Sequence, residues 1–516
     1  MKEILVLCLT RFGDLIQTTP LLRGLRKSHP DARITLAVLK RFSGILPLIQ
    51  GYDRVFIFDK DEAAHRISRS EEPLAAFRHM DEFICALEQD EYDLIVNLTC
   101  DRMSAYVVSA LKATTVSGIN AAANGQRVIS GMWATHLFSV LLGENRRLNR
   151  INLVDIFSRM GGITPDGQAV ALHETTAGKH FAERFIENEG LAGEVLIGIQ
   201  LGASETVRCW PVESFAGLSD MLQARPGVRI ILFGSPGEKE LGERTMAAMR
   251  SVPVNAVGRT GIEELYSLVK CCSLLVTNDT GTMHFAAAAG TPVVMLSIGP
   301  AFFRSTGPYS SGNLALQPRL PCSPCRYNLK CHDPICRNIL SLEAVHAACR
   351  MLLGETVDLE ASFPGVGVYR SHFDPDGFLE WQGLCNLDPR QEELTLRYAR
   401  IWKDFLDTDL PFHPEQQGPP ASDLAALTSR GMELTGRIMA AARLQPLPVE
   451  LITSLGEQEA AVEAEIKLLG SCDNEMAPLI DFLTLIRENI TDDDLQTIAH
   501  QTRKLYEQGS RLASLL

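Results

Sequence analysis

The sequence predicts an α/β protein of two doubly wound halves that face a cleft, followed by an all-helical appendage. Apolar strand patterns alternate with helical patterns over residues 1–353, which is typical of parallel sheets. The alternation starts afresh at Val195, after a connection near residues 167–193. Beyond about residue 354 we find only amphipathic helical patterns. Because 516 residues exceed what one hydrophobic core organises, we predict domains at residues 1–175, 190–355 and 356–516.

The first half shows five apolar runs separated by helical patterns. The opening run ends at a turn, after which leucines and isoleucines recur at helical spacing. The predicted strands are residues 2–10, 33–39, 54–59, 93–98 and 114–118. The predicted helices are residues 15–25, 74–89, 103–111 and 151–160. We expect right-handed crossovers between the parallel strands.

The second half repeats this rhythm. Its predicted strands are residues 195–201, 228–233, 254–257, 274–276 and 292–296. Its predicted helices are residues 212–222, 238–249, 262–270 and 342–353, with an alanine-rich helix after the turn at residues 278–282. Two similar α/β halves indicate two Rossmann-like domains, and a cleft between domains is a favoured ligand site.

The C-terminal part carries helical stripes with good start signals. The predicted helices are residues 388–405, 422–438, 457–469, 478–489 and 492–515. The apolar stripes are best explained as core. Any surplus apolar area would suit docking of a partner or oligomerisation.

Composition and charge exclude some classes of protein. A net charge of −14 argues against a nucleic-acid partner, because binding to phosphate backbones needs clustered basic charge. Residues 1–60 nevertheless hold ten Lys/Arg against five Asp/Glu, which leaves open an anionic substrate or peripheral contact with a membrane surface. No apolar run approaches a membrane span, and the start lacks a signal-peptide cleavage site. We therefore expect a cytoplasmic protein, with the inner face of the cytoplasmic membrane as a candidate contact.

The turn at residues 278–282 is the strongest candidate for ligand binding. It connects a strand to a helix at the carboxyl edge of the predicted sheet, where Gly281 and Thr282 would present free N–H groups to a phosphate. Asp279 and Thr280 could instead only cap the helix. His284 could donate to the same phosphate, although a buried position within the helix is the better expectation.

Three further turns supply candidate side chains. Asp14, in the first helical turn after Gly13, could deprotonate a hydroxyl, or it could only stabilise the helix dipole. Ser204 and Arg208 leave the strand at residues 195–201 and could clamp a diphosphate, although Arg208 could equally be a surface residue beside a structural Trp. Glu238 could bind a ribose or a purine amine, with capping as the simpler alternative.

Four cysteines lie within fifteen residues, which is a separate signal. Cys322, Cys325, Cys331 and Cys336 open with a Cys-x-x-Cys spacing, which suits a tetrahedral Zn or Fe site. The alternative is a set of reduced or disulfide-paired thiols, which a cytosolic setting disfavours. A metal here would be structural and would order the loop beside the cleft.

Four motifs together resemble glycosyltransferase family nine, whose best-known members are the ADP-heptose:lipopolysaccharide heptosyltransferases. They are Arg-Phe-Gly-Asp-Leu-Ile-Gln-Thr-Thr-Pro-Leu-Leu-Arg-Gly-Leu-Arg (residues 11–26), Gly-Ala-Ser (202–204) with Arg-Cys-Trp-Pro (208–211), Phe-Gly-Ser-Pro-Gly-Glu (233–238) and Asn-Asp-Thr-Gly-Thr-Met-His (278–284). The resemblance covers about residues 1–353. It implies a GT-B fold, with the acceptor on the first domain and the nucleotide sugar mainly on the second.

The resemblance also implies the site residues. Asp14 matches the catalytic base, with Arg11, Gly13 and Thr18 on the acceptor side. The donor-binding set is Ser204, Arg208, Glu238, Asp279, Thr280, Gly281, Thr282 and His284. Arg208 stands where the family commonly has Lys, which keeps the charge and changes its shape. No catalytic metal is expected, and some protein heptosyltransferases of the family bind iron through cysteines like those above.

The predicted activity is inverting transfer of a heptose or a related sugar from a nucleotide-linked donor, with ADP favoured. The acceptor could be a lipopolysaccharide core, another glycan, a lipid-linked saccharide or a protein. Among possible enzyme functions, the main alternative is transfer of a sugar from a different donor. The alternative from another class is a non-catalytic nucleotide-sugar-binding or assembly protein that acts through its helical appendage.

Overall fold

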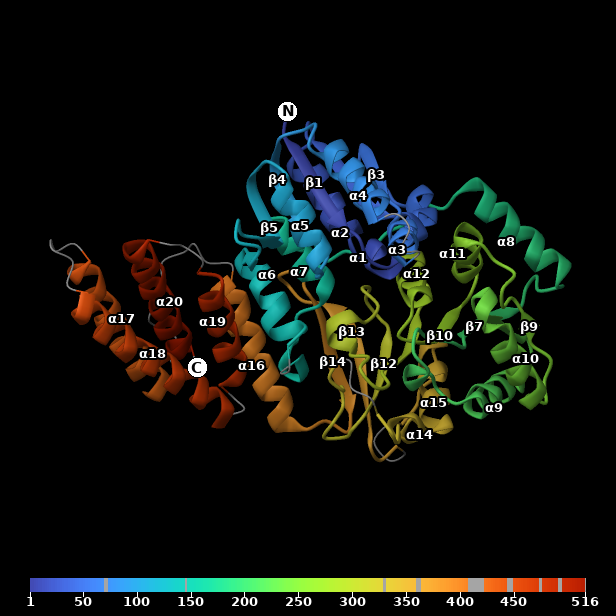
Figure 1. The fold of residues 1–516 in the computed structure, drawn as a ribbon. Helices are drawn as coiled ribbons and strands as arrows, with labels where there is room; N and C mark the ends of the chain where they lie inside the picture. Colours follow the sequence, from blue (N-terminus) through green and yellow to red (C-terminus); the bar gives the residue numbers. More distant parts are fainter. Residues whose placement is uncertain are drawn as a thin grey trace. The chain divides into compact units, whose positions relative to one another are not determined.

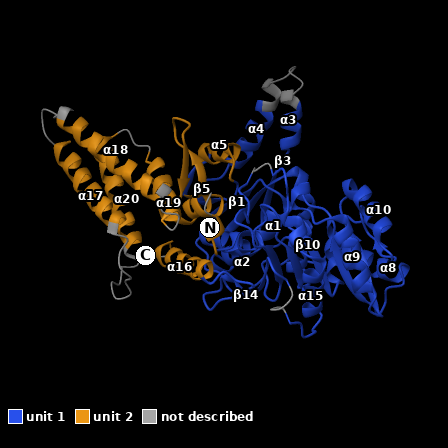
Figure 2. Ribbon diagram, turned by 90° about the horizontal axis from the view of Figure 1, so that it is seen from below, with its two compact units in different colours: residues 1–99, 111–115, 151–389 blue, residues 100–110, 116–150, 390–516 orange. Residues whose placement is uncertain are grey.

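The computed structural model describes residues 1–68, 73–143, 146–327, 331–358, 363–406, 422–442, 449–472, 476–490 and 494–515. The chain divides into two compact units, shown in different colours in Figure 2. Unit 1 consists of Met1–Thr99, Leu111–Thr115 and Ile151–Pro389. Unit 2 consists of Cys100–Ala110, Val116–Arg150 and Arg390–Leu516. Every predicted site residue lies in unit 1. The domain boundaries predicted from the sequence remain predictions.

The first sheet has the strand order β3-β2-β1-β4-β5-β6. Its strands are β1 (Glu3–Cys8), β2 (Arg33–Leu39), β3 (Arg54–Phe58), β4 (Tyr92–Asn97), β5 (Ala113–Ala121) and β6 (Arg127–Ser130). β1 pairs in parallel with β2 and β4, and β2 pairs in parallel with β3. The apolar residues of β1 are buried on both faces, as expected for a central parallel strand. The helices of this half within unit 1 are α1 (Phe12–Gln17), α2 (Thr19–Ser28), the 3₁₀ segment η1 (Lys40–Leu48), α3 (Lys60–Ser68), α4 (Pro73–Leu87) and α7 (Leu153–Met160).

The second sheet has the order β14-β13-β12-β11-β10-β7-β8-β9. Its strands are β7 (Val195–Gln200), β8 (Val228–Phe233), β9 (Val254–Asn255), β10 (Leu274–Asn278), β11 (Val293–Leu296), β12 (Leu314–Pro318), β13 (Val366–Phe373) and β14 (Leu379–Cys385). The strands from β7 to β12 pair in parallel. The accompanying helices are α8 (Thr176–Asn188), α9 (Val212–Gln223), α10 (Lys239–Ala248), α11 (Ile262–Lys270), α12 (Gly281–Ala289), α13 (Phe303–Thr306), α14 (Cys336–Ile339) and α15 (Leu342–Leu352), with short 3₁₀ turns η4 (Thr206–Arg208) and η5 (Pro236–Glu238). The two predicted α/β halves are confirmed (Figure 1).

The expectation that residues after 354 form helices alone is wrong for one hairpin. β13 pairs antiparallel with β14 and with the edge strand β12. The two strands meet at a turn in which Asp374 accepts the N–H of Phe378, and Gly377 takes the left-handed conformation with φ +84°. The hairpin covers the edge of a sheet that would otherwise expose unpaired N–H and C=O groups. A partner strand elsewhere in the chain therefore decides the conformation of this segment.

The remaining C-terminal residues are helical, as predicted. Their helices are α16 (Pro389–Leu406), α17 (Ser422–Ala441), α18 (Val449–Cys472), α19 (Ala477–Glu488) and α20 (Leu495–Leu515). In unit 2 they join α5 (Arg102–Ala110), α6 (Met132–His136), the π-helical turn η2 (Leu137–Leu141) and η3 (Arg146–Leu148). Trp402 packs between His136 and Phe482, with ring centroids 4.9 and 5.0 Å away. A segment from the first half of the chain is thus part of the helical unit.

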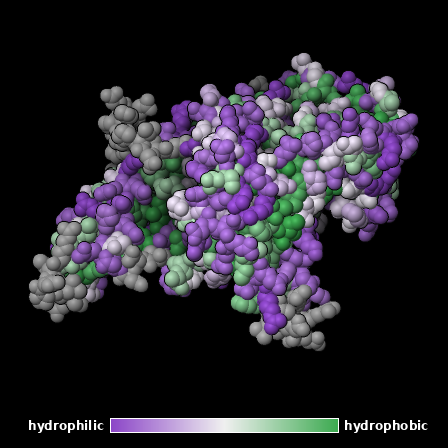
Figure 3. All heavy atoms as spheres, turned by 90° about the horizontal axis from the view of Figure 1, so that it is seen from above, coloured by the Kyte–Doolittle hydropathy of each residue, from purple (hydrophilic) through white to green (hydrophobic). Residues whose placement is uncertain are grey.

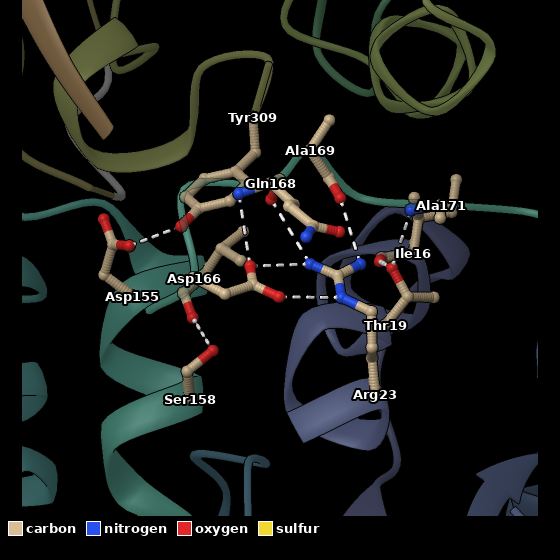
Figure 4. Close-up of polar contacts among 11 residues, drawn as sticks. Ile16, Thr19, Arg23, Asp155, Ser158, Asp166, Gln168, Ala169, Ala171 and Tyr309 are labelled. Atoms are coloured by element: carbon tan, nitrogen blue, oxygen red, sulfur yellow. Dashed lines mark hydrogen bonds and ion pairs between the residues drawn. The ribbon is translucent and has the colours of Figure 1, made fainter. Parts of the chain in front are cut away.

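The connection between the two α/β halves forms hydrogen bonds with both of them (Figure 4). Arg23 on α2 holds Asp166 through two hydrogen bonds of 2.9 and 3.0 Å. On the other side, Val170 donates its N–H to the carbonyl of Tyr309 at 3.2 Å. The Tyr309 hydroxyl donates to the fully buried Asp155 of α7 at 2.5 Å, which ties the second half directly to the first. These contacts fix the spacing of the two halves on which the site depends.

The outer surface is mostly hydrophilic on the face shown in Figure 3, with smaller areas of hydrophobic residues. Within the described ranges, no helix is long and apolar enough to cross a membrane.

Candidate active site

The predicted base lies at the start of α1, directly after β1. The carboxylate of Asp14 accepts the backbone N–H of Arg11 at 3.2 Å, which closes the first turn of the helix. Arg11 itself is exposed, whereas Asp14 is partly buried. The β1 strand ends at the carboxyl edge of its sheet, so the turn presents Asp14 at the edge where α/β proteins bind ligands.

The start of α12 lies against the start of α1, and Figure 1 shows the two helices side by side. The two helices could not approach each other so closely if Gly13 or Gly281 were replaced by a larger residue. A Cβ atom on Gly281 would stand 2.6 Å from the ring of Phe12, and one on Gly13 would stand 3.1 Å from the ring of His284. Phe12 also packs on Phe285, with centroids 6.3 Å apart. Two glycines therefore bring the turn between β1 and α1 of the first half and the turn between β10 and α12 of the second half together.

Electrostatics at this junction suit a general base. Burial raises the pKa of Asp14 above its ordinary value, and the negative charge of Asp279 raises it further, against the opposing effect of Arg11. A carboxylate with a raised pKa accepts a proton more readily. Asp279, from the second half, contributes to this shift through its charge.

Arg208 lies beside Asp279, which just precedes the start of α12. Its guanidinium reaches Asp279 at 3.4 Å and Glu205 at 3.7 Å, and its side chain is 13% exposed. Its Nε atom is buried and has no hydrogen-bond partner among the described residues. Both ion pairs are long, so Arg208 keeps hydrogen-bonding capacity that an anion could use.

Asn278 organises the loop that carries Arg208, a function that the sequence did not reveal. The side chain is fully buried, accepts the N–H of Trp210 at 3.0 Å, and donates to the carbonyls of Leu201 and Gly202 at 3.0 and 3.3 Å. Its only sequence signal is an amide at the end of a buried strand. Through these bonds, β10 holds both ends of the loop from Gly202 to Trp210.

Glu238 lies beside the same loop. It accepts the N–H of Ser235 at 2.5 Å, and a Cβ on Gly202 would collide with its carboxylate. The capping contact predicted as the simpler alternative is therefore present, and the carboxylate lies directly against Gly202, at the start of the loop that carries Arg208.

The other predicted residues take varied positions. The hydroxyl of Thr282 is buried and donates to Gln200 at 2.8 Å, and that of Thr280 lies 3.2 Å from the hydroxyl of Thr277. Ser204 is exposed on the loop. Thr18 is fully buried, and its hydroxyl donates to Leu15 within its own turn, so it is not open to a ligand in this conformation.

His284 is buried, as expected. Burial lowers its pKa to about 4, so the ring is neutral at pH 7. Its Nδ1 atom has no hydrogen-bond partner among the described residues. The ring packs against Gly13 at the junction.

Three of the four cysteines lie in the loop before α14, and Cys336 is the first residue of that helix. Burial raises the pKa of Cys325 to about 11, and the neighbouring Cys322, Cys336 and Cys331 raise it as well. In the part of the chain that the structure describes, which omits residues 328–330 of this loop, no group of three or more His, Cys, Asp or Glu is arranged to hold a metal ion. A metal here therefore remains a prediction, and no chemical step below depends on it.

Comparison with known proteins assigns this arrangement to a family. The model of glycosyltransferase family 9 (heptosyltransferase) matches residues 80–335. The chain belongs to glycosyltransferase family 9. Among curated family members, lipopolysaccharide heptosyltransferase 3 of Escherichia coli is 28% identical over 295 residues, which cover 55% of this chain and 80% of that protein. The chain is therefore a glycosyltransferase.

Solved family 9 structures share the fold. A glycosyl transferase family 9 protein from Veillonella parvula DSM 2008 superposes with a TM-score of 0.54 at 22% identity, covering 69% of this chain and 98% of that one. E. coli ADP-heptose lps heptosyltransferase II gives a TM-score of 0.50 at 19% identity, covering 68% and 98%. The predicted GT-B fold of two Rossmann-like domains is thereby confirmed.

Proposed function

We propose that this family 9 enzyme transfers a heptose from ADP-heptose to a saccharide of the lipopolysaccharide core, with inversion at the anomeric carbon. The observation that carries the proposal is the junction of α1 and α12, where α1, which holds Asp14, packs on the start of α12 and the charge of Asp279 acts on Asp14. The donor and acceptor are chosen because the E. coli relatives are named lipopolysaccharide and ADP-heptose heptosyltransferases.

In the proposed reaction, Asp14 removes the proton of the acceptor hydroxyl as its oxygen attacks the anomeric carbon. The new C–O bond forms on the face opposite the diphosphate, and the bond to the diphosphate breaks with its electron pair, leaving ADP. The transition state has oxocarbenium character, as in glycoside hydrolysis. Arg208 and the first N–H groups of α12 would stabilise the charge that develops on the departing phosphate.

Glu238 would bind the nucleoside, and Ser204, Thr280 and His284 would complete the donor side. Arg11 and Gly13 would line the acceptor side. Thr18 needs a change in its hydroxyl contact before it can contribute. Peripheral contact with a membrane and oligomerisation through the helical unit remain predictions, as does a protein acceptor. Membership of a family of transferases disfavours the alternative of a non-catalytic assembly protein.

Asp14→Asn tests the proposal. The amide keeps the shape and can no longer accept the proton, so transfer should fall at least about a thousandfold while ADP affinity stays within about twofold. Asp220→Asn serves as the control, because this carboxylate caps Arg250 and Ser251 through their backbone N–H groups. Calorimetry with ADP, UDP and GDP, with transfer from ADP-heptose measured in parallel, identifies the donor. Unchanged transfer by Asp14→Asn would contradict the assignment of the base.

A further inference from the structure

The loop that carries Arg208 is held from a second direction, by the residues that follow the last of the four cysteines. The Nε–H of Arg337 donates to the carbonyl of Cys209 at 2.6 Å. Three residues later, the carbonyl of Leu340 accepts the indole N–H of Trp210 at 2.9 Å. Cys209 and Trp210 directly follow Arg208 in the chain. Two consecutive residues of this loop are thus tied to α14 and its end.

The other side of the same loop touches the cysteine loop through Gly299. A Cβ on Gly299 would lie 3.4 Å from the carbonyl oxygen of Val207, so the two backbones are in close contact. Gly299 in turn accepts the backbone N–H of Cys325 at 3.0 Å. The neighbours of Arg208 on both sides are therefore contacted by residues close to the cysteines: Val207 by Gly299, which bonds to Cys325, and Cys209 by Arg337.

The side chain of Arg208 has weak anchors of its own. Its contacts with Asp279 and Glu205 are 3.4 and 3.7 Å long, beyond the length of a strong charged hydrogen bond. Its position must therefore follow the backbone of residues 207–209. Among the described residues, the bond from Arg337 to the Cys209 carbonyl, at 2.6 Å, is the shortest hydrogen bond to this backbone.

We propose that Arg337 is a positioning residue for the donor diphosphate: it holds the Cys209 carbonyl and thereby sets Arg208 in place. The proposal rests on the proposed function, because it assumes that Arg208 binds the diphosphate of ADP-heptose. It assigns to α14, which begins at the last of the four cysteines, an influence on donor binding that passes through Arg208, and it leaves the chemistry of the sugar to Asp14.

The first test separates binding from chemistry. Arg337→Gln should raise the KM for ADP-heptose and the Kd for ADP about tenfold, because a charged hydrogen bond is lost. The kcat at saturating donor and the KM for the acceptor should change less than about threefold. Arg337→Lys, which keeps a charged donor, should recover most of the affinity. Arg225→Gln is the matched control, since Arg225 forms a half-exposed ion pair with Glu355 in the same half.

A double-mutant cycle tests whether the effect passes through Arg208. In an Arg208→Ala background, Arg337→Gln should weaken ADP binding by less than about twofold. An equal loss in both backgrounds, or an unchanged donor KM in Arg337→Gln, would overturn the inference while leaving the proposed function standing. Wild-type protein that binds no ADP would overturn both. If Arg337→Gln lowers the melting temperature and weakens acceptor binding as much as donor binding, the substitution damages the fold in general. That result would also overturn the inference.

Discussion

Gly281 faces Phe12 across the junction of the two α/β halves so closely that a single added carbon would lie 2.6 Å from the aromatic ring. Gly281 was predicted from the sequence as a source of N–H groups for a phosphate. The structure adds a second reason for glycine at this position. Gly281 allows the ring of Phe12, from the first half, to pack on α12, the helix that begins at this turn. The distance between the proposed base, Asp14, and the proposed donor turn therefore depends on this contact.

Gly281→Ala should consequently separate α1 from α12. A displacement of about 1 Å between reacting groups commonly costs a hundredfold in rate, so we expect kcat/KM to fall between about tenfold and a hundredfold. Phe12→Ala combined with Gly281→Ala should recover most of the loss, because the collision is removed. Gly456→Ala is the control, since a Cβ there meets no atom within 4 Å. Equal activity of the single and double variants would show that the contact does not set the geometry.

The acid limb of the pH–rate profile should depend on Asp279. Asp14 must be ionised to accept a proton, so kcat/KM rises with pH through the pKa of Asp14 in the free enzyme. Asp279 raises that pKa through its negative charge. Asp279→Asn removes the charge and should move the midpoint of the acid limb to lower pH, even if the rate at the plateau falls. A midpoint that stays in place, or moves upward, would contradict the electrostatic coupling of these two residues.

Burial of His284 should make stability depend on pH. Its pKa is about 4 in the folded protein, against an ordinary value of 6.5, so the unfolded chain binds the proton more tightly. The stability contributed by the neutral ring is therefore present above pH 6.5 and is lost as pH falls toward 4, by about 3 kcal/mol. His284→Gln should lose less stability than the wild type between pH 7 and pH 4.5 in denaturant titrations. His180→Gln, at an exposed position, should follow the wild type.

The order of strands and helices could be predicted because each of those elements carries its own periodicity. The hairpin of β13 and β14 could not, because its conformation depends on pairing with β12, some 50 residues earlier. Asp14 and Asp279 were predicted from turn chemistry at the ends of strands. The bonds of Asn278 to Leu201 and Gly202 span 77 and 76 residues, and the bond from Arg337 to Cys209 spans 128, so no local pattern indicates them.

Metal analysis tests the four-cysteine loop. A bound Zn or Fe would stabilise thiolates that the unmetallated loop disfavours, since Cys325 otherwise has a pKa of about 11. We expect about one equivalent of metal in purified protein and much less in Cys322→Ser and Cys325→Ser. Cys85→Ser, an exposed cysteine on α4, should retain the wild-type content. Equal metal content in all variants would assign the metal to another site or to contamination.

Tyr309→Phe tests the fastening between the two halves. The hydroxyl donates to the buried Asp155 at 2.5 Å, and its loss leaves a buried carboxylate with one partner fewer. Such a loss typically lowers the free energy of unfolding by about 1–3 kcal/mol, which a urea titration would measure. Tyr52→Phe is the control, because its hydroxyl donates to the neutral carbonyl of Leu46 at 3.3 Å and should cost less than about 1 kcal/mol. If the two variants lose equal stability, the charge of Asp155 does not strengthen the hydrogen bond that joins the two halves. A larger loss for Tyr309→Phe, together with a raised KM for donor, would show that the spacing of the halves and the assembly of the site depend on the same contact.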